Sequence, residues 1–167
     1  MNENIITKFF ESTTGVIYPL SVTYNKGYFH PTSLDEKMPF YLETIVINEG
    51  IEEIAPAVLS LCVKLHTIKF PSTLREIGER AFSRCVSLKN IKFPEGLERI
   101  YDYAFESCRS IESLIIPSTV SIIGENAFFG CKKLKYFVVL NPELSYDNIG
   151  LPTGCKVIRP GKGVETV

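Results

Sequence analysis

Residues 65–85 read LHTIKFPSTLREIGERAFSRC, and this stretch decides the fold. Apolar and polar side chains alternate over residues 68–70, which is typical of a short strand with one buried face. Pro71 ends that strand because its nitrogen has no hydrogen to donate to a sheet. Residues 79–85 predict one or two helical turns with the Ala-Phe pair and the cysteine on one side. A helix this short is not stable alone, so it needs neighbours above and below it.

The same pattern recurs at a period of 23 residues. The cysteine column consists of Cys62, Cys85, Cys108 and Cys131, and the proline column of Pro71, Pro94 and Pro117. An aliphatic residue three positions after each cysteine, an isoleucine and the Ala-Phe pair form further columns. One unit of this length buries too little apolar surface to fold alone, so equivalent units stack as coils of a solenoid. Equivalent strands then become parallel neighbours about 4.8 Å apart.

The columns divide the chain into three parts. We predict complete coils at residues 42–64, 65–87, 88–110 and 111–133, followed by a fifth strand from Leu134, so that the repeat region is 42–140. Residues 1–41 form an N-terminal cap with a degenerate coil at 19–41, and residues 141–167 form a C-terminal cap and tail. Atypical ends are expected because a solenoid otherwise exposes its core and its strand edges.

Details of the two caps follow from shorter patterns. Ile5, Ile6, Phe9 and Phe10 suit either one face of a helix or a β-hairpin through Gly15, and both alternatives stay open. Residues 22–28 align with residues 45–51 one period later, which places Tyr28 opposite Ile51. At the other end we predict a shortened strand around Val157 and a mobile tail from Gly161.

The pattern LxxIxFPxxLxxIGxxAFxxCxx, which starts at Leu65, resembles the BspA-like leucine-rich repeats of bacterial and protist proteins, many of them at the cell surface. The similarity covers about residues 42–140. It implies an α/β repeat, namely a right-handed leucine-rich-repeat solenoid with short parallel strands, short helices or turns on the opposite side and irregular terminal caps. It also implies adhesion or protein binding, and it implies no catalytic residues. We expect no cofactor and no metal.

The cysteine column is the first candidate for chemistry. Metal ligands converge on one point, commonly as closely spaced pairs, whereas these cysteines occur once per coil. Disulfides between coils meet a second difficulty, because parallel Cβ vectors would strain the S–S torsion. We therefore interpret the column as small buried residues. Cys155 follows Cys131 by 24 residues, falls outside the column and can be exposed.

Other titratable residues give weaker signals. Glu79, Asp102 and Glu125 stand at the start of the predicted helices, where exposed N–H groups favour a negative charge. His30 and His66 belong to no metal-ligand spacing and are interpreted as surface or packing residues. The sequence therefore favours a protein that is not an enzyme. An enzyme remains an alternative that a deep pocket with converging titratable groups would support.

The outward positions of the predicted strands are the preferred candidate site. The residues proposed to bind a partner are Val46, Lys69, Lys92, Ile115, Tyr136 and Val138. Beside them runs a second outward column, Thr44, Thr67, Asn90, Ser113 and Tyr136. Repeat proteins commonly bind through such extended faces. The alternatives are contact with the C-terminal cap, or ordinary exposed apolar residues without a role. Phe129 adds an exposed aromatic residue on another side.

Composition limits the partners. The chain has 167 residues and a formal net charge of −1, so nothing draws it as a whole to nucleic acid or to an anionic membrane. No apolar run approaches the ~20 residues of a membrane span. We predict a protein partner, with a glycan as the second choice and a self-associating structural domain as the alternative role. The resemblance favours the cell surface or secretion, yet the sequence shows no signal peptide and its thiols suit a reducing cytoplasm, so the location stays open.

Overall fold

The computed structural model describes residues 5–11, 17–23, 28–29, 43–47 and 49–167. Its strands are β1 (Ile5–Glu11), β2 (Ile17–Thr23), β3 (Tyr28–Phe29), β4 (Thr44–Val46), β5 (Glu53–Ile54), β6 (Thr67–Lys69), β7 (Glu76–Ile77), β8 (Arg99–Ile100), β9 (Ser113–Ile116), β10 (Ile122–Ile123), β11 (Tyr136–Val139), β12 (Lys156–Arg159) and β13 (Gly163–Thr166). His30 and most of the coil predicted at 19–41 lie outside the described residues.

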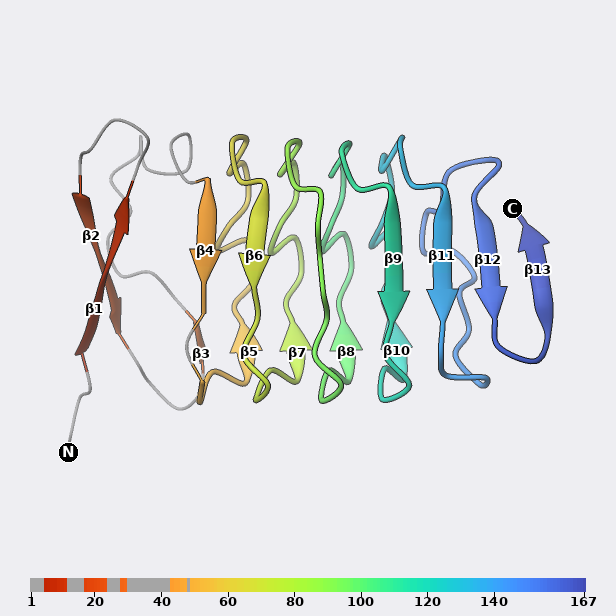
Figure 1. Ribbon diagram of the computed structural model, residues 1–167, viewed down its shortest axis with the longest axis horizontal. Helices are drawn as coiled ribbons and strands as arrows, with labels where there is room; N and C mark the ends of the chain where they lie inside the picture. Colours follow the sequence, from red (N-terminus) through yellow and green to blue (C-terminus); the bar gives the residue numbers. More distant parts are fainter. Residues whose placement is uncertain (1–4, 12–16, 24–27, 30–42, 48) are drawn as a thin grey trace.

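The strands form two parallel ladders, so a coil contributes two strands where the sequence predicted one. The first ladder contains β4, β6, β9, β11 and β12, and the second contains β3, β5, β7, β8 and β10. Equivalent residues pair directly, as Ile45 does with Ile68 and Ile54 with Ile77. Figure 1 shows the two rows of arrows following the same long axis. The chain is therefore a parallel β-solenoid of about 5 turns, as the stacked columns predicted.

Turns replace the helices that were predicted opposite the first ladder. The backbone φ is +54° at Arg80 and +63° at Arg84, a left-handed conformation that ends any right-handed helix. The equivalent positions of the other coils are also left-handed, at Ala57, Leu61, Tyr103, Ser107, Asn126 and Gly130. As a result, no helix forms in the part of the chain that the structure describes: of the predicted short helices or turns the turns are confirmed, and the helical alternative, with the α/β class, is wrong.

Backbone hydrogen bonds explain why turns are preferred here. The N–H of Phe82 donates to the carbonyl of Ala104 in the next coil at 2.8 Å, and that of Arg84 donates to Glu106 at 2.7 Å. The N–H groups between them bond within their own turn. Every second N–H therefore donates to the next coil, whereas in a helix each would donate to the carbonyl four residues earlier in the same segment. These bonds join neighbouring coils on the turn side as the ladders do elsewhere.

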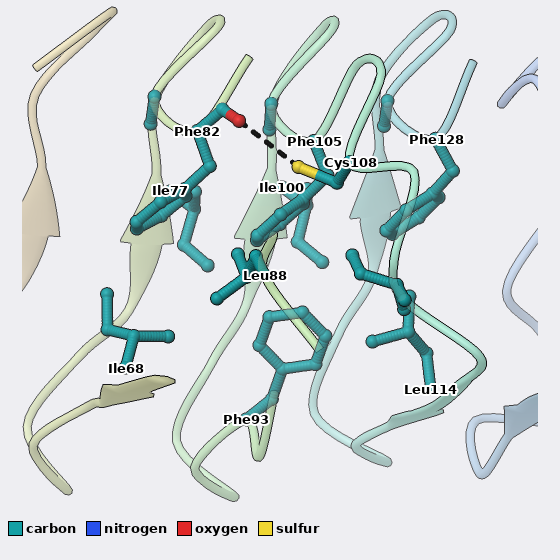
Figure 2. Close-up of a cluster of buried hydrophobic side chains, with 14 of the residues drawn as sticks. Ile68, Ile77, Phe82, Leu88, Phe93, Ile100, Phe105, Cys108, Leu114 and Phe128 are labelled. Carbon is teal, nitrogen blue, oxygen red and sulfur yellow. Dashed lines mark hydrogen bonds between the residues drawn. The ribbon is translucent and has the colours of Figure 1, made fainter. Parts of the chain in front are cut away.

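A stack of phenylalanine rings fills the centre of the solenoid. The rings of Phe82, Phe105 and Phe128 are fully buried and nearly parallel, with centroids 5.1 and 5.7 Å apart along the stack. Figure 2 shows these three rings in line, with Phe93 reaching up from the strand side. Phe93 meets Phe105 edge to face at 5.7 Å. Ring pairs at such distances add stability beyond their buried area, so the column binds each coil to the next.

The cysteine column is buried, as the sequence predicted, and it also has a bonding role that the sequence did not reveal. The Cys108 thiol donates to the Phe82 carbonyl of the preceding coil at 3.1 Å, a bond drawn in Figure 2. Cys85 and Cys131 repeat this contact with Leu59 and Phe105 at 3.1 and 3.2 Å. Burial is the first cause that raises the pKa of the Cys131 thiol to about 12. These cysteines are therefore neutral donors between coils.

The first ladder is interrupted between its third and fourth coils. In the third coil only Asn90 bridges to β6, and no backbone hydrogen bond joins residues 88–93 to residues 111–116. Figure 1 shows this stretch without an arrow, between β6 and β9. The second ladder continues past the same point, because β8 pairs with β10. We call the interruption the seam. It divides the first ladder into two sheets, and the second ladder joins the coils that carry them.

The N-terminal residues form a hairpin. Strands β1 and β2 pair antiparallel, which confirms the hairpin alternative and makes the helical one wrong. Strand β3 then joins the second ladder, where Tyr28 pairs with Glu53. The sequence alignment had placed Tyr28 opposite Ile51, two residues away, so the degenerate coil does not keep the 23-residue register.

The C-terminal residues form a second hairpin. Strand β12 confirms the predicted shortened strand, and β13 pairs antiparallel with it, so the residues predicted to be a mobile tail form a strand. Arg159 contributes to this order by donating to the carbonyls of Pro142 and Leu144 at 2.6 and 2.5 Å. Tyr136 pairs with Lys156, so the last step is shorter than the repeat, and Cys155 is buried rather than exposed.

Candidate binding face on the first ladder

The sheet register determines which predicted site residues lie together. Val46 is directly opposite Lys69 on the N-terminal side of the seam, and Ile115 is opposite Val138 on the C-terminal side. Lys92 is exposed in the stretch between these two sheets. The six candidates therefore follow one row along the solenoid, but the seam prevents them from forming a single continuous sheet.

On the C-terminal side, the outward row is apolar across four strands. Ile115 is opposite Val138, Val138 is opposite Ile158, and Ile158 is opposite Val164. Ile115 and Val164 keep 58% and 62% of their surface exposed. Tyr136, on the neighbouring outward column, is 46% exposed. We call Ile115, Tyr136, Val138, Ile158 and Val164 the C-terminal apolar patch.

The sequence analysis did not predict two members of this patch. Ile158 and Val164 lie outside the 23-residue register, because the last step is shorter and β13 runs antiparallel. The signal was present in the turn-forming stretch Pro160-Gly161-Lys162-Gly163, which precedes a run of alternating residues. Strands β12 and β13 lie beside β11 in Figure 1 and extend its sheet. The cap therefore adds to the patch, and Ile115 and Tyr136 remain exposed beside it.

The N-terminal side of the row has a different character. Val46 is 44% exposed, and Lys69 and Lys92 are both exposed. Two lysines on a regular ladder are too few to form an electrostatic track along a nucleic acid. The face thus changes from weakly basic to apolar along the solenoid axis, with the change at the seam.

The acidic residues at the start of the turns, Glu79, Asp102 and Glu125, make contacts that differ from the predicted ones. Without helices there is no helix end for these carboxylates to stabilise. Instead, Asp102 Oδ1 accepts the N–H of Glu125 from the next coil at 2.8 Å, and Glu79 pairs with its neighbour Arg80. His66 lies with its Nε2 3.8 Å from a Glu43 oxygen at the surface. These groups thus make contacts between or within coils.

Within the described residues, no three candidate metal ligands gather in one place. Nor do these residues form any helix that is long and apolar enough to cross a bilayer. Phe129 is 55% exposed on the turn side, as the sequence predicted, and it lies away from the strand row.

Comparisons with known proteins agree with this geometry. A family model described as BspA type leucine rich repeat region matches residues 38–150 in 6 copies. No curated protein matches the chain. Among solved structures, the leucine rich repeat protein of T. pallidum aligns with a TM-score of 0.59 and 24% identity, over 92% of this chain and 61% of that one.

Two further structures extend the comparison. The pneumococcal vaccine antigen PcpA aligns with a TM-score of 0.63 and 22% identity, over 89% of this chain and 34% of that one. A leucine rich cell surface protein from Faecalibacterium prausnitzii aligns with a TM-score of 0.55 and 25% identity, over 80% of this chain and 42% of that one. The chain thus spans less than two thirds of each of these three proteins.

Proposed function

The chain belongs to the BspA-type leucine-rich repeat family, and on this basis we propose that it is a non-enzymatic interaction module that binds a protein partner through its first ladder. Stacked coils make a rigid support, so few interface side chains must be ordered on binding. The observation that carries the proposal is the C-terminal apolar patch, in which five side chains from four paired strands share one outward surface. Apolar and aromatic clusters of this kind supply most of the energy in many interfaces.

Tyr136 is the residue on which we expect binding to depend most. It combines a large apolar ring with a hydroxyl, and it lies between Ser113 and Lys156, whose polar groups suit the rim of an interface. Val138 lies two residues further along the same strand. Replacing both by alanine removes the centre of the patch and leaves the inward Phe137 and Val139 in place.

The test is capture of partners from the native environment with the intact chain. We expect the Tyr136→Ala, Val138→Ala double variant to bind at least about tenfold more weakly, since central aromatic residues commonly contribute that much. Phe129→Ala is the matched control, because it removes an exposed aromatic ring from the turn side. Equal capture by the double variant and the wild type would exclude the patch as the binding site.

Adhesion at a cell surface is the setting we propose for this binding. The F. prausnitzii structure is named as a cell surface protein, and at 25% identity it supports the setting by analogy. Surface labelling of intact source cells, with a cytoplasmic protein as the reference, tests the location. A glycan partner is the second choice, and binding to deproteinised glycan fractions would favour it over a protein.

Self-association is a second candidate that one observation favours. Strand β13 pairs with β12 on one side and ends the sheet, and Val164 on it is exposed. A sheet edge of this kind can pair with a second copy. Light scattering over a concentration series separates the two roles, because a monomer at every concentration would remove self-association from consideration.

A further inference from the structure

A hollow of about 650 Å³ opens where the turns lead into the first ladder. Its lining comes from equivalent stretches of successive coils on both sides of the seam, where each coil enters the first ladder, and it includes Lys64, Ser87, Lys89, Asn90, Ser110 and Lys133. Its volume falls within the range of about 300–1,000 Å³ that is typical of ligand sites. Ligand sites are commonly apolar, but this lining consists of charged and hydrogen-bonding side chains, so its occupant must be polar.

The seam explains why a hollow forms at this place. In the other coils the N–H at the start of the ladder bonds to the preceding coil, as Lys135 does with Glu112 at 2.9 Å. At the seam, the Glu112 N–H has no acceptor and the Lys89 carbonyl has no donor among the described residues. The two sheets are therefore not closed against each other at the point that the hollow crosses.

The charges of the lining favour an anion. Three lysines contribute to it, against one carboxylate, that of Glu43, which lies beside His66. The described residues give neither Lys89 nor Lys133 an ion pair. Two ammonium groups in one concave surface, with hydroxyls from Ser87 and Ser110 as further donors, attract negative charge to that spot.

The lining also distinguishes among classes of anionic partner. Single-stranded nucleic acids are held by rows of aromatic side chains that stack on successive bases, whereas the hollow has no Phe, Tyr or Trp in its lining and one imidazole, that of His66, which lies beside Glu43. The lining has three lysines and no arginine, so it offers separate point charges and lacks the planar fork that holds a phosphate or sulfate by two parallel hydrogen bonds. Carboxylates on a flexible peptide can reach separate point charges one at a time.

The hollow adjoins the C-terminal apolar patch. Lys133 precedes Tyr136 by three residues in the chain, and Ser110 precedes Ser113 by the same number. A protein seated on the patch therefore lies next to the hollow. We propose that the hollow binds an acidic peptide segment of the partner, with its carboxylates at Lys89 and Lys133. This proposal rests on the proposed function and adds the chemistry of the partner, namely an acidic segment next to an apolar one.

The test uses the whole chain and a fluorescent oligoglutamate peptide, followed by anisotropy. We expect saturable binding that weakens as salt is raised, because exposed charges are screened over about 10 Å at 0.1 M ionic strength. Oligolysine should not bind. The Lys89→Glu, Lys133→Glu double variant should bind oligoglutamate at least about tenfold more weakly, since it replaces two attractions with two repulsions.

Two further variants make the result specific. Lys132→Glu is the matched control, because Lys132 neighbours Lys133 in sequence, is exposed and does not line the hollow. It should bind like the wild type. The neutral pair Lys89→Gln, Lys133→Gln should give an intermediate loss, and it answers the question even if the double reversal fails to fold.

Three outcomes would overturn the proposal. The first is absence of oligoglutamate binding, and the second is equal binding by the wild type and the neutral pair. The third is tighter binding of a sulfated oligosaccharide than of oligoglutamate, if that binding is lost in the same lysine variants. Because the peptide is free and needs no native partner, none of these outcomes bears on the Tyr136 experiment, so the two proposals fail separately.

Discussion

Removing one ring from the middle of the phenylalanine stack is the sharpest test of how the coils are held together. Phe105 contacts three rings, namely Phe82 at 5.1 Å, Phe128 at 5.7 Å and Phe93 at 5.7 Å between centroids. Phe105→Leu keeps an apolar side chain in the core but loses all three ring pairs. At about 0.5–1.5 kcal/mol per pair, the expected loss in free energy of unfolding is about 1.5–4.5 kcal/mol.

The assay is urea or thermal unfolding followed by circular dichroism. A loss of about 3 kcal/mol corresponds to a fall in melting temperature of roughly 6–12 °C for a chain of this size. Phe128→Leu provides a graded comparison, because Phe128 contacts only Phe105 and Phe137 among the described rings, so its loss should be about 1 kcal/mol smaller. Phe129→Leu is the matched surface control, with an expected effect within about 0.5 kcal/mol. If Phe105→Leu were no more destabilising than Phe129→Leu, the stack would not hold the coils together.

Three further predictions follow from the turns and the thiols. Gly150→Ala should lower the unfolding midpoint clearly, because φ is +79° and a Cβ would lie 2.8 Å from the Phe129 backbone nitrogen. Gly161→Ala, at φ +81° with open space around it, should lower the midpoint less. Equal losses would show that contact with Phe129 does not determine the effect. The buried cysteines of the native protein should resist thiol reagents near neutral pH and react fully in denaturant. Rapid labelling of the cysteine column in the native protein would refute the burial of these thiols. The pKa of Cys131 is raised from an ordinary value of 9.0 to about 12, so the folded state holds this proton more tightly, and stability should fall between those pH values by up to about 1.4 kcal/mol per pH unit. Cys131→Ala should make that slope less steep by up to the same amount, while the other buried thiols with raised pKa values keep their share of it, and an unchanged slope would show that the Cys131 thiol does not titrate as described.

The repeat could be predicted because its period is encoded in buried apolar side chains of characteristic size. Burial selects Ile68, Phe82 and Cys85 by size and polarity, and each recurs one period later, so the stacked coils and the outward row were accessible from the sequence. The family membership rests on the same columns.

The helices were wrongly predicted because the competing interaction is not local. Residues 79–85 have helical side-chain spacing, but the N–H groups of Phe82 and Arg84 gain bonds to a neighbouring coil. Nothing within one repeat shows that this neighbour exists at hydrogen-bonding distance. The left-handed residues that permit the turn include Arg80 and Tyr103, which carry no glycine-like signal.

The second ladder and the seam were missed for related reasons. Glu76–Ile77 is a strand of two residues, too short to show an alternation. The seam breaks hydrogen bonds without breaking the columns, since Asn90 and Ser113 still occupy equivalent places. The hollow over the seam, with Lys89 and Lys133 in its lining, therefore has no signature in the repeat pattern.

The most direct test of the central claim is NMR detection of scalar couplings across hydrogen bonds on the turn side. Stacked coils in register predict a coupling between the amide nitrogen of Phe82 and the carbonyl carbon of Ala104, whose oxygen lies 2.8 Å from that nitrogen. The same coupling should join Phe105 to Ala127 in the next pair of coils. Coupling of the Phe82 amide to Gly78 instead would mean that these segments are helices, and it would contradict the coil-to-coil register on which the binding face depends.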